Sequence, residues 1–286
     1  MGKSFLPKNI LRNLDMRIDP DAWLGGNVAK KLKINFALSH IIIFYWAITD
    51  FTLLGLLVGI ASYVFIGKMG ADIGFHRYFT HRSFEVTSWI RRYLLWNATL
   101  IGHGSVLLWV ATHRIHHAKG DTDEDPHSPL HHGILTTWLR SWTSTNKPNM
   151  MLMKDVMRDK EIVFLHKNYF KVFYAFLACL LIAWAVGNIY PLLFLFAFPN
   201  AGFFHEAGMV NSICHMWGYR TYDTKDNGRN NLIVNFLTFG NGLHNTHHAK
   251  PNMYTCDVHG KWYEIDPMKY IIKLIANDRS RVENKV

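Results

Sequence analysis

Cysteine is scarce in this sequence of 286 residues, and its three cysteines, Cys179, Cys214 and Cys256, are far apart with no CxxC spacing. Neither a disulfide framework nor a cysteine-based zinc module is expected from such spacing. Charge is also scarce, because Asp, Glu, Lys and Arg make up 18% of the residues, below the roughly 25% of a typical soluble domain. A disulfide-rich secreted protein and an evenly charged soluble domain are both disfavoured.

Lysine and arginine are absent from residues 34–67 and again from 172–219, although the formal net charge is +10. Basic segments that flank apolar windows without positive charge are typical of membrane proteins that follow the positive-inside rule. Binding to nucleic acid does not require long apolar segments without Lys or Arg, even in a protein with the same net charge. The charge distribution therefore indicates a membrane protein and argues against nucleic acid as a partner.

Each apolar window is long enough to hold two membrane spans. The first, from Ile34 to about Met69, exceeds what one helix needs to cross a hydrocarbon core of about 30 Å. Its polar break at Thr49-Asp50 predicts helices over about 33–49 and 51–70. The second window, about 169–214, is expected to divide at Gly187-Asn188. Since neither turn carries Lys or Arg, we expect four spans with both termini in the cytoplasm.

Residues 87–112 are apolar but carry Arg91-Arg92, Asn97 and Gly102–Gly104, which favours a helix lying in the membrane interface over a fifth span. The predicted fold is all-α: one domain over 1–286, with four transmembrane helices, interfacial helices and a helical cytoplasmic cap that carries a histidine-rich di-metal site. Its predicted segments are a cytoplasmic N-terminal part (1–32), a transmembrane hairpin (33–70), a cytoplasmic or interfacial part (71–168), a second hairpin (169–214) and a cytoplasmic part (215–286).

Histidine is abundant, with 17 residues, and eight of them form three clusters. Spacings of three and four residues place the imidazoles of the second and third clusters on one helix face each. The first pair is five residues apart, which predicts a helix end. Neutral imidazole suits iron, zinc and copper, and eight exceed what one ion uses, so a two-metal site is predicted. The clusters are His76 and His81; His113, His116 and His117; and His244, His247 and His248.

A single HxxHH in a polar helix is more often an incidental surface feature than a metal site. Three clusters, each beside the cytoplasmic end of a predicted span or interfacial helix, favour the metal site. Two membrane crossings separate the second cluster from the third, and they return the chain to the same side. All eight imidazoles are therefore able to converge.

Four sequence motifs resemble the membrane-bound fatty acid desaturases, in particular the acyl-CoA and acyl-lipid Δ9 group, over about residues 35–275. They are HRYFTHRSF, WVATHRIHH followed by DEDPHSP, NSICHMWGYR, and GNGLHNTHHAKP followed by EIDP. In having a threonine, Thr112, directly before the second cluster, the chain resembles the bacterial-type members of that family. The resemblance implies two iron ions, with Asn211 reaching the metal through a water, and these metal-site residues: His76, His81, His113, His116, His117, Asn211, His215, His244, His247 and His248.

The resemblance also implies an oxidoreductase that uses O2 to introduce a cis double bond into an acyl chain carried by CoA or by a lipid. Its expected partners are that substrate, membrane lipid, and an electron-transfer protein such as ferredoxin or cytochrome b5. The net positive charge suggests that an acidic donor docks on the cap. Two alternatives stay open: a related acyl or carotenoid hydroxylase or ketolase, and a histidine-rich membrane metal transporter.

Several further side chains have two interpretations each. Trp109, one helical turn before His113, either forms a wall of an acyl tunnel or packs in the core. The acidic run Asp121, Asp123, Glu124 and Asp125, with His127, His131 and His132 after it, either orients ligating imidazoles or forms a solvated loop. For the ionisable groups in apolar surroundings, local hydrogen bonding or a tunnel lining is expected, and His166 and His259 are expected at the surface. Those groups are His40, His103, His205 and Glu206.

Overall fold

The computed structural model describes residues 27–140 and 150–277, and all regular structure within them is helical. Extended pairing in these ranges is limited to isolated bridges such as Val86 with Ala276. The all-α prediction is confirmed for this part of the chain. Most of the predicted N-terminal segment 1–32 lies outside the described residues.

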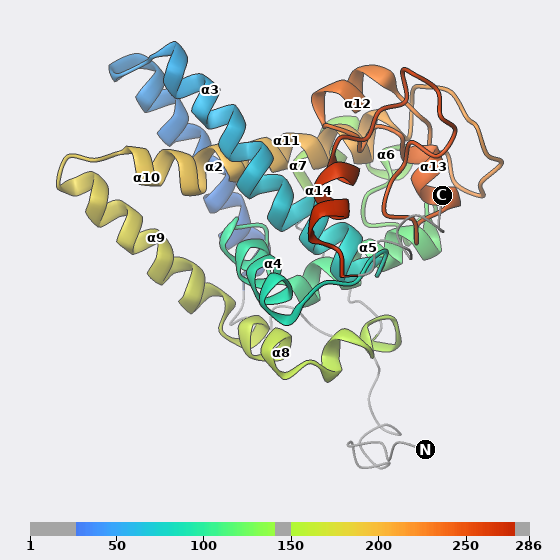
Figure 1. Cartoon of the computed structure of the whole chain (residues 1–286), viewed down its shortest axis with the longest axis horizontal. Helices are drawn as coiled ribbons and strands as arrows, with labels where there is room; N and C mark the ends of the chain where they lie inside the picture. The colour runs from blue at the N-terminus through green and yellow to red at the C-terminus, as the bar shows by residue number, and fades with distance from the viewer. Residues whose placement is uncertain (1–26, 141–149, 278–286) are drawn as a thin grey trace.

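Two antiparallel helices form the first hairpin (Figure 1). Helix α2 spans Val28–Thr49, and α3 (Leu53–Ser62) begins where the Thr52 hydroxyl accepts a hydrogen bond from the Gly55 amide at 3.0 Å. Helix α3 continues through two π-helical stretches, η1 (Tyr63–Gly67) and η2 (Met69–Thr80). The second helix therefore runs ten residues beyond the predicted end at 70, and it carries the chain directly into the first histidine cluster.

The second hairpin divides where the sequence predicts. Helix α9 (Tyr169–Ala185) ends before Gly187, whose φ of +95° suits glycine. The chain returns through α10 (Tyr190–Leu192), η5 (Leu193–Ala197) and α11 (Phe198–Ile213). Helix α11 packs against α2 and the α3–η1 helix, and Figure 1 shows it passing behind them toward the opposite end of the molecule.

Within residues 27–140 and 150–277, two helices are long and apolar enough to cross a membrane: Val28–Thr49, with 22 residues, and Leu53–Thr80, with 28 residues. A third is obtained if α8 (Lys160–Lys167) and α9, which are bent by 69° relative to each other, count as one span. These findings show an apolar helical framework suited to a membrane. The number of four spans stays a prediction.

The segment expected to be one interfacial helix over 87–112 is instead two helices, α4 (Ser88–Leu100) and α5 (Val106–Lys119). Gly102 and Gly104, with φ of +86° and +95°, break the helix because other residues rarely adopt this conformation. The buried amide of Asn200 donates to the Ile101 carbonyl at 2.7 Å, and that of Asn35 donates to the Gly102 carbonyl at 3.3 Å. The break is therefore fixed against α11 and α2.

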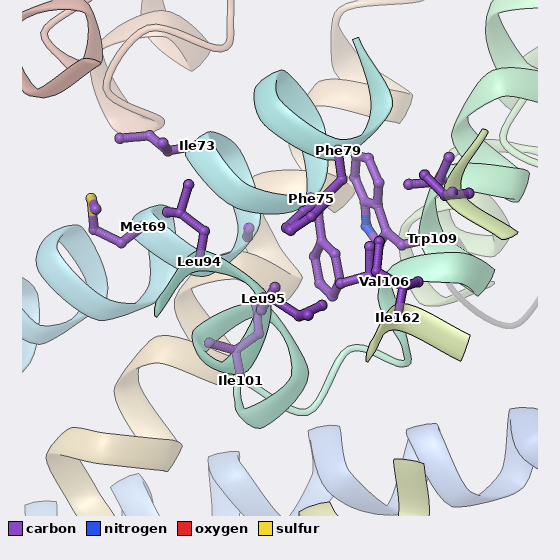
Figure 2. Packing of buried hydrophobic residues seen from close by; sticks show 14 of the residues in the cluster. Met69, Ile73, Phe75, Phe79, Leu94, Leu95, Ile101, Val106, Trp109 and Ile162 are labelled. Atoms are coloured by element: carbon purple, nitrogen blue, oxygen red, sulfur yellow. The ribbon is translucent and has the colours of Figure 1, made fainter. Parts of the chain in front are cut away.

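The largest hydrophobic core lies where η2, α4, α5 and α8 meet (Figure 2). The rings of Phe75 on η2 and Trp109 on α5 stack with 5.4 Å between centroids and 3° between planes. Phe75 precedes His76, and Trp109 lies one turn before His113, so this contact sets the separation of the first two histidine clusters. The remaining helices are α6 (Pro129–His132), α7 (Ile134–Arg140), η3 (Met150–Met153), η4 (Val156–Arg158), α12 (Leu232–Leu237), α13 (His244–Ala249) and α14 (Met268–Ile275).

The break between α4 and α5 generates a stability prediction. A Cβ at Gly102 would lie 2.7 Å from the Asn200 amide nitrogen and 3.0 Å from the Phe173 ring, whereas one at Gly187 meets nothing within 4 Å. Both Ala variants carry backbone strain of about 1–2 kcal/mol, but only Gly102→Ala adds overpacking of about 1–3 kcal/mol. In thermal unfolding of the detergent-solubilised protein, we expect Gly102→Ala to melt clearly below Gly187→Ala. Equal melting temperatures would contradict the packed break.

Candidate metal centre

The first histidine pair lies at the end of η2, and its five-residue spacing fits the π-helix. The backbone N–H of His81 donates to the carbonyl of His76 at 3.1 Å, which is the i→i+5 bond of a π-turn. Residues five apart then share a face, and the two imidazole centroids are 4.9 Å apart. His81 caps η2, so the predicted helix end is confirmed. On an ideal α-helix, residues five apart would be separated by about 140° around the axis, and the π-turn removes that separation.

The second and third clusters lie on two short helical faces that meet. His113, His116 and His117 occupy the last two turns of α5, and the third cluster fills most of α13. Their nearest ring atoms are close: His117 Nε2 lies 2.9 Å from His247 Nε2, and His116 Nε2 lies 3.2 Å from His248 Nε2. The helices thus bring side chains about 130 residues apart into one site.

The structure brings all nine predicted histidines together in two groups, each with candidate ligand atoms within 4.8 Å of one another. We call them the five-histidine group and the four-histidine group. The first is His76, His81, His113, His117 and His247; the second is His116, His215, His244 and His248.

The spacing of the nitrogen atoms fits a bound transition-metal ion. Within the groups, neighbouring Nε2 atoms are 2.9–3.2 Å apart, for example His76 to His247 at the short end and His116 to His248 at the long end. Nitrogen ligands about 2.0–2.1 Å from one ion lie about 2.9–3.4 Å apart at coordination angles of 90–109°. Neutral imidazole lone pairs facing each other this closely repel unless a cation lies between them. The donor set therefore fits two metal ions.

Three carboxylates fix the rings of the four-histidine group from behind. The Nδ1 atoms of His116, His215 and His248 donate to Asp125, Asp121 and Asp226 at 2.9, 2.8 and 2.9 Å. Since a carboxylate accepts, each Nδ1 carries the proton and each Nε2 directs its lone pair into the site.

The pKa values of Asp125, Asp226 and His248 agree with that assignment, while His116 has a raised pKa because Asp125 outweighs the effect of its burial. Burial raises the pKa of Asp125 and of Asp226, but the imidazoles of His116 and His248 outweigh it and hold both pKa values well below the usual range. Burial lowers the pKa of His248 to about 4 despite its contact with Asp226. The carboxylates are therefore ionised, and the His248 imidazole stays neutral and available for a metal at neutral pH.

In the part of the chain that the structure describes, the five-histidine group has one such contact, and it is longer. His76 Nδ1 lies 3.5 Å from Asp72 Oδ1. Asp72 is fully buried and also contacts Arg77 at 3.0 Å and Lys68 at 3.1 Å. Charged groups at this depth are costly and are usually retained for a function.

Asn211 lies in the last turn of α11, and His215 follows two residues after the helix ends. The helix ends at Ile213, and Cys214 N–H bonds to the Met209 carbonyl at 3.4 Å in a widened last turn. Asn211 is buried and lines a pocket together with His244 and His247. Among the described residues, Asn211 lies beside the imidazoles without a hydrogen bond to them, which suits an indirect role.

A pocket with about 490 Å³ of empty volume opens against both histidine groups. Trp109 lines it and is buried, and its ring stacks on His113 with 4.7 Å between centroids. The ring packs against Phe75, which confirms the packing interpretation, and it also lines the pocket. Its role as a wall of an acyl tunnel stays a prediction. The full lining is Asp72, His76, Trp109, His113, Phe203, Glu206, Ala207, Val210, Asn211, Asn241, His244, His247 and Cys256.

The acidic run after the second cluster divides into two kinds of residue. Asp121 and Asp125 orient imidazoles, whereas Glu124 is exposed and pairs with Lys119 at 2.7 Å. His127 is buried with its ring centroid 5.5 Å from that of His116, and burial lowers the pKa of His127 to about 3. His131 and His132 are exposed, and their Nε2 atoms lie 3.0 and 3.1 Å from the Asp121 and Asp125 carbonyls.

The other ionisable groups in apolar surroundings make the expected local contacts, whereas the surface position predicted for His166 is wrong. His103 Nε2 contacts the Asn200 carbonyl at 2.9 Å, and His40 Nε2 contacts His205 Nε2 at 2.9 Å. His166 was expected at the surface but is buried, with its Nδ1 2.6 Å from the Ser105 hydroxyl. This hydroxyl also caps α5, so His166 lies beneath the start of the second-cluster helix.

Sequence reasoning missed three residues of the site: Lys68, Asp72 and Asp226. Lys68 and Asp72 were detectable from the sequence, because they are charged residues at the edge of an apolar window. Asp226 had no such signal, because it lies in a polar loop and reaches His248 only through the fold.

Comparison with known proteins matches the family model "Fatty acid desaturase" over residues 35–270. The sn-1 stearoyl-lipid 9-desaturase of Anabaena variabilis is 34% identical over 221 residues, which cover 76% of this chain and 79% of that protein. The acyl-CoA C20 Delta5-desaturase of Anemone leveillei is 32% identical, covering 75% and 69%, and Delta-9 acyl-lipid desaturase 1 of Arabidopsis thaliana is 30% identical, covering 79% and 73%.

The chain belongs to the fatty acid desaturase family. It is therefore an oxidoreductase of the kind that the motifs indicated. The relatives carry different names for the position of the double bond and for the acyl carrier, so membership of the family leaves both properties of this desaturase to be determined.

Metal content tests the two groups. We expect the purified desaturase to bind two metal ions per chain, and His117→Ala or His215→Ala to lower this to about one, because each removes an inward nitrogen from one group only. Mass spectrometry of the bound metal measures the content. His131→Ala is the matched control, since it removes an exposed histidine near Asp121 and should keep both ions. One ion per chain in the unmodified protein would contradict the two-group site.

Proposed function

We propose that this protein uses O2 and two bound iron ions to introduce a cis double bond at the Δ9 position of a fatty acyl chain. The observation that carries the proposal is the pocket, because imidazoles from both histidine groups form one of its walls and apolar side chains form another. The apolar wall consists of Trp109, Phe203, Ala207 and Val210. Such a pocket suits a methylene chain held against two metal ions.

The five-histidine and four-histidine groups would each hold one iron, and Asn211 would complete the four-histidine position through a water. Imidazole also suits zinc and copper, so iron rests on family membership and on the reaction. Bound iron would supply the activation of O2 that no protein acid or base can replace when an unactivated C–H bond is broken.

The protein's own residues would position the chain and exclude water. The buried apolar residues of α11 that line the pocket would contact methylene groups without offering a hydrogen-bond partner, and the carbon face of the Trp109 indole would add apolar contact. Holding one C–C bond in a fixed orientation toward the metal side supplies much of the selectivity. Two polar residues of the same pocket already bind each other, since Asn241 donates to Glu206, and Lys68, which lies outside the pocket lining, donates to Glu206 as well.

We propose a membrane topology of four spans with both termini in the cytoplasm, so that the histidine groups meet on the cytoplasmic side. The two long apolar helices and the return of the chain through α11 support it. The substrate would be acyl-CoA or an acyl-lipid, as the names of the relatives suggest. An external protein such as ferredoxin or cytochrome b5 would supply electrons, and the net charge of +10 favours an acidic donor.

Expression in a host that lacks its own desaturase tests the reaction. We expect the chain to produce monounsaturated fatty acid about two mass units lighter than its saturated precursor, because two hydrogens leave. His116→Ala should abolish the product, while His131→Ala keeps it. A product about sixteen mass units heavier would identify a hydroxylase instead, and metal uptake with unchanged lipids would indicate a transporter.

Filling the pocket tests where the acyl chain lies. Ala207→Phe places a ring in the apolar wall, so we expect desaturation to fall about tenfold or more through displacement of the chain, with metal content unchanged. Gas chromatography of the lipids and metal analysis measure the two effects. Leu195→Phe, at an exposed position in η5, is the control and should retain activity. Equal activity of both variants would place the substrate elsewhere.

A further inference from the structure

The two histidine groups differ in the charge that lies behind them. Three of the four imidazoles in the four-histidine group contact a carboxylate at 2.8–2.9 Å. In the five-histidine group, His76 makes such a contact, to Asp72 at 3.5 Å.

Neutral donors complete the surroundings of the three carboxylates. Asp121 accepts from the backbone N–H of Asn227 at 2.7 Å and from the Ser128 hydroxyl at 2.9 Å. Asp125 accepts from the backbone N–H of Asp121, and Asp226 from that of Gly228, both at 2.8 Å. These bonds keep the carboxylates ionised without cancelling their charge.

Cations surround Asp72 instead. Arg77 and Lys68 contact it at 3.0 and 3.1 Å, and all three side chains are at most 3% exposed. Each of these cations also pairs with a second carboxylate: Arg77 with Asp266 at 2.7 Å and Lys68 with Glu206 at 2.8 Å. Three carboxylates and two cations thus nearly balance behind the five-histidine group, whereas three carboxylates with neutral partners lie behind the four-histidine group.

We infer that Asp121, Asp125 and Asp226 make the four-histidine position the one that retains the ferric ion when the centre takes up its first electron. Anions close to a metal stabilise its higher charge, and the effect is strong in a buried site. A carboxylate that accepts from a ligating imidazole also makes that ligand more electron-rich. The inference rests on the proposed function in that it requires two bound irons.

With iron bound, the five-histidine group would hold the ion that is reduced first, and the four-histidine group would hold the ion that is reduced second, at a lower potential. Each step is a one-electron conversion of ferric to ferrous iron, with a reduced redox dye as the reductant. Asp121, Asp125 and Asp226 act by positioning and polarising imidazoles, so their effect is visible in the potentials themselves.

Redox titration of the detergent-purified, iron-57-loaded full chain tests this, with Mössbauer spectra recorded at each potential. The variants are Asp121→Asn and Asp226→Asn, which keep an acceptor oxygen for the imidazole and remove one charge. Asn tolerates the left-handed conformation of residue 121, whose φ is +59°. Asp72→Asn is the matched variant behind the other group, and Glu124→Gln, at an exposed carboxylate, is the control.

We expect two separate steps in the unmodified protein. Asp121→Asn and Asp226→Asn should each raise the potential of the second step and narrow the interval between the steps. Asp72→Asn should raise the first step and widen the interval, and Glu124→Gln should change neither. This opposite response separates a charge effect from a general loosening of the site, which thermal unfolding of each variant checks independently.

Simultaneous reduction of both irons would overturn the inference. So would an interval between the two reduction steps that Asp121→Asn and Asp226→Asn leave unchanged or widen. In either case the proposed function still stands if the protein binds two irons and is an active desaturase. Fewer than two irons in the unmodified protein would overturn both. If one variant fails to fold, the other decides, since the two carboxylates contact different imidazoles.

Discussion

The convergence of nine imidazole nitrogens on one small volume is the constraint on which the remaining structure depends. Nitrogens 2.9–3.2 Å apart repel each other unless cations lie between them, so the fold must hold these side chains in place. The Phe75–Trp109 stack separates the first two clusters, the Asn35 and Asn200 amides fix the α4–α5 break, and carboxylates clamp the rings. The apolar helices supply the frame on which these contacts are built.

Much of this was accessible from the sequence because it is periodic or compositional. Windows without Lys or Arg mark the hairpins, Gly187 marks the second turn, and the spacing of three and four residues places two clusters on helix faces. The resemblance to desaturases added His215 and Asn211, which no spacing rule would single out. All nine histidines then proved to lie in the two groups.

What the sequence could not provide depends on backbone departures and on long-range contacts. The π-helical η2 changes which residues share a face, and a five-residue spacing read on an α-helix gives the wrong angle for His76 and His81. The division of 87–112 needed the φ values of Gly102 and Gly104 together with amides from α2 and α11. The contacts of Asp226 with His248 and of Ser105 with His166 form only after distant segments have packed. The local sequence pattern therefore does not indicate either contact.

The distribution of carboxylates suggests why a site made of neutral imidazoles needs acidic residues behind it. Nine histidines contribute no charge, so two metal ions buried among them would leave several positive charges uncompensated in a medium where charge is costly. Asp121, Asp125 and Asp226 would compensate through the rings, which would leave the inward positions to nitrogen and the pocket side to Asn211 and the substrate. Direct carboxylate ligands would occupy those positions. Compensation from behind therefore serves both the stability of the loaded centre and the access of an acyl chain to it.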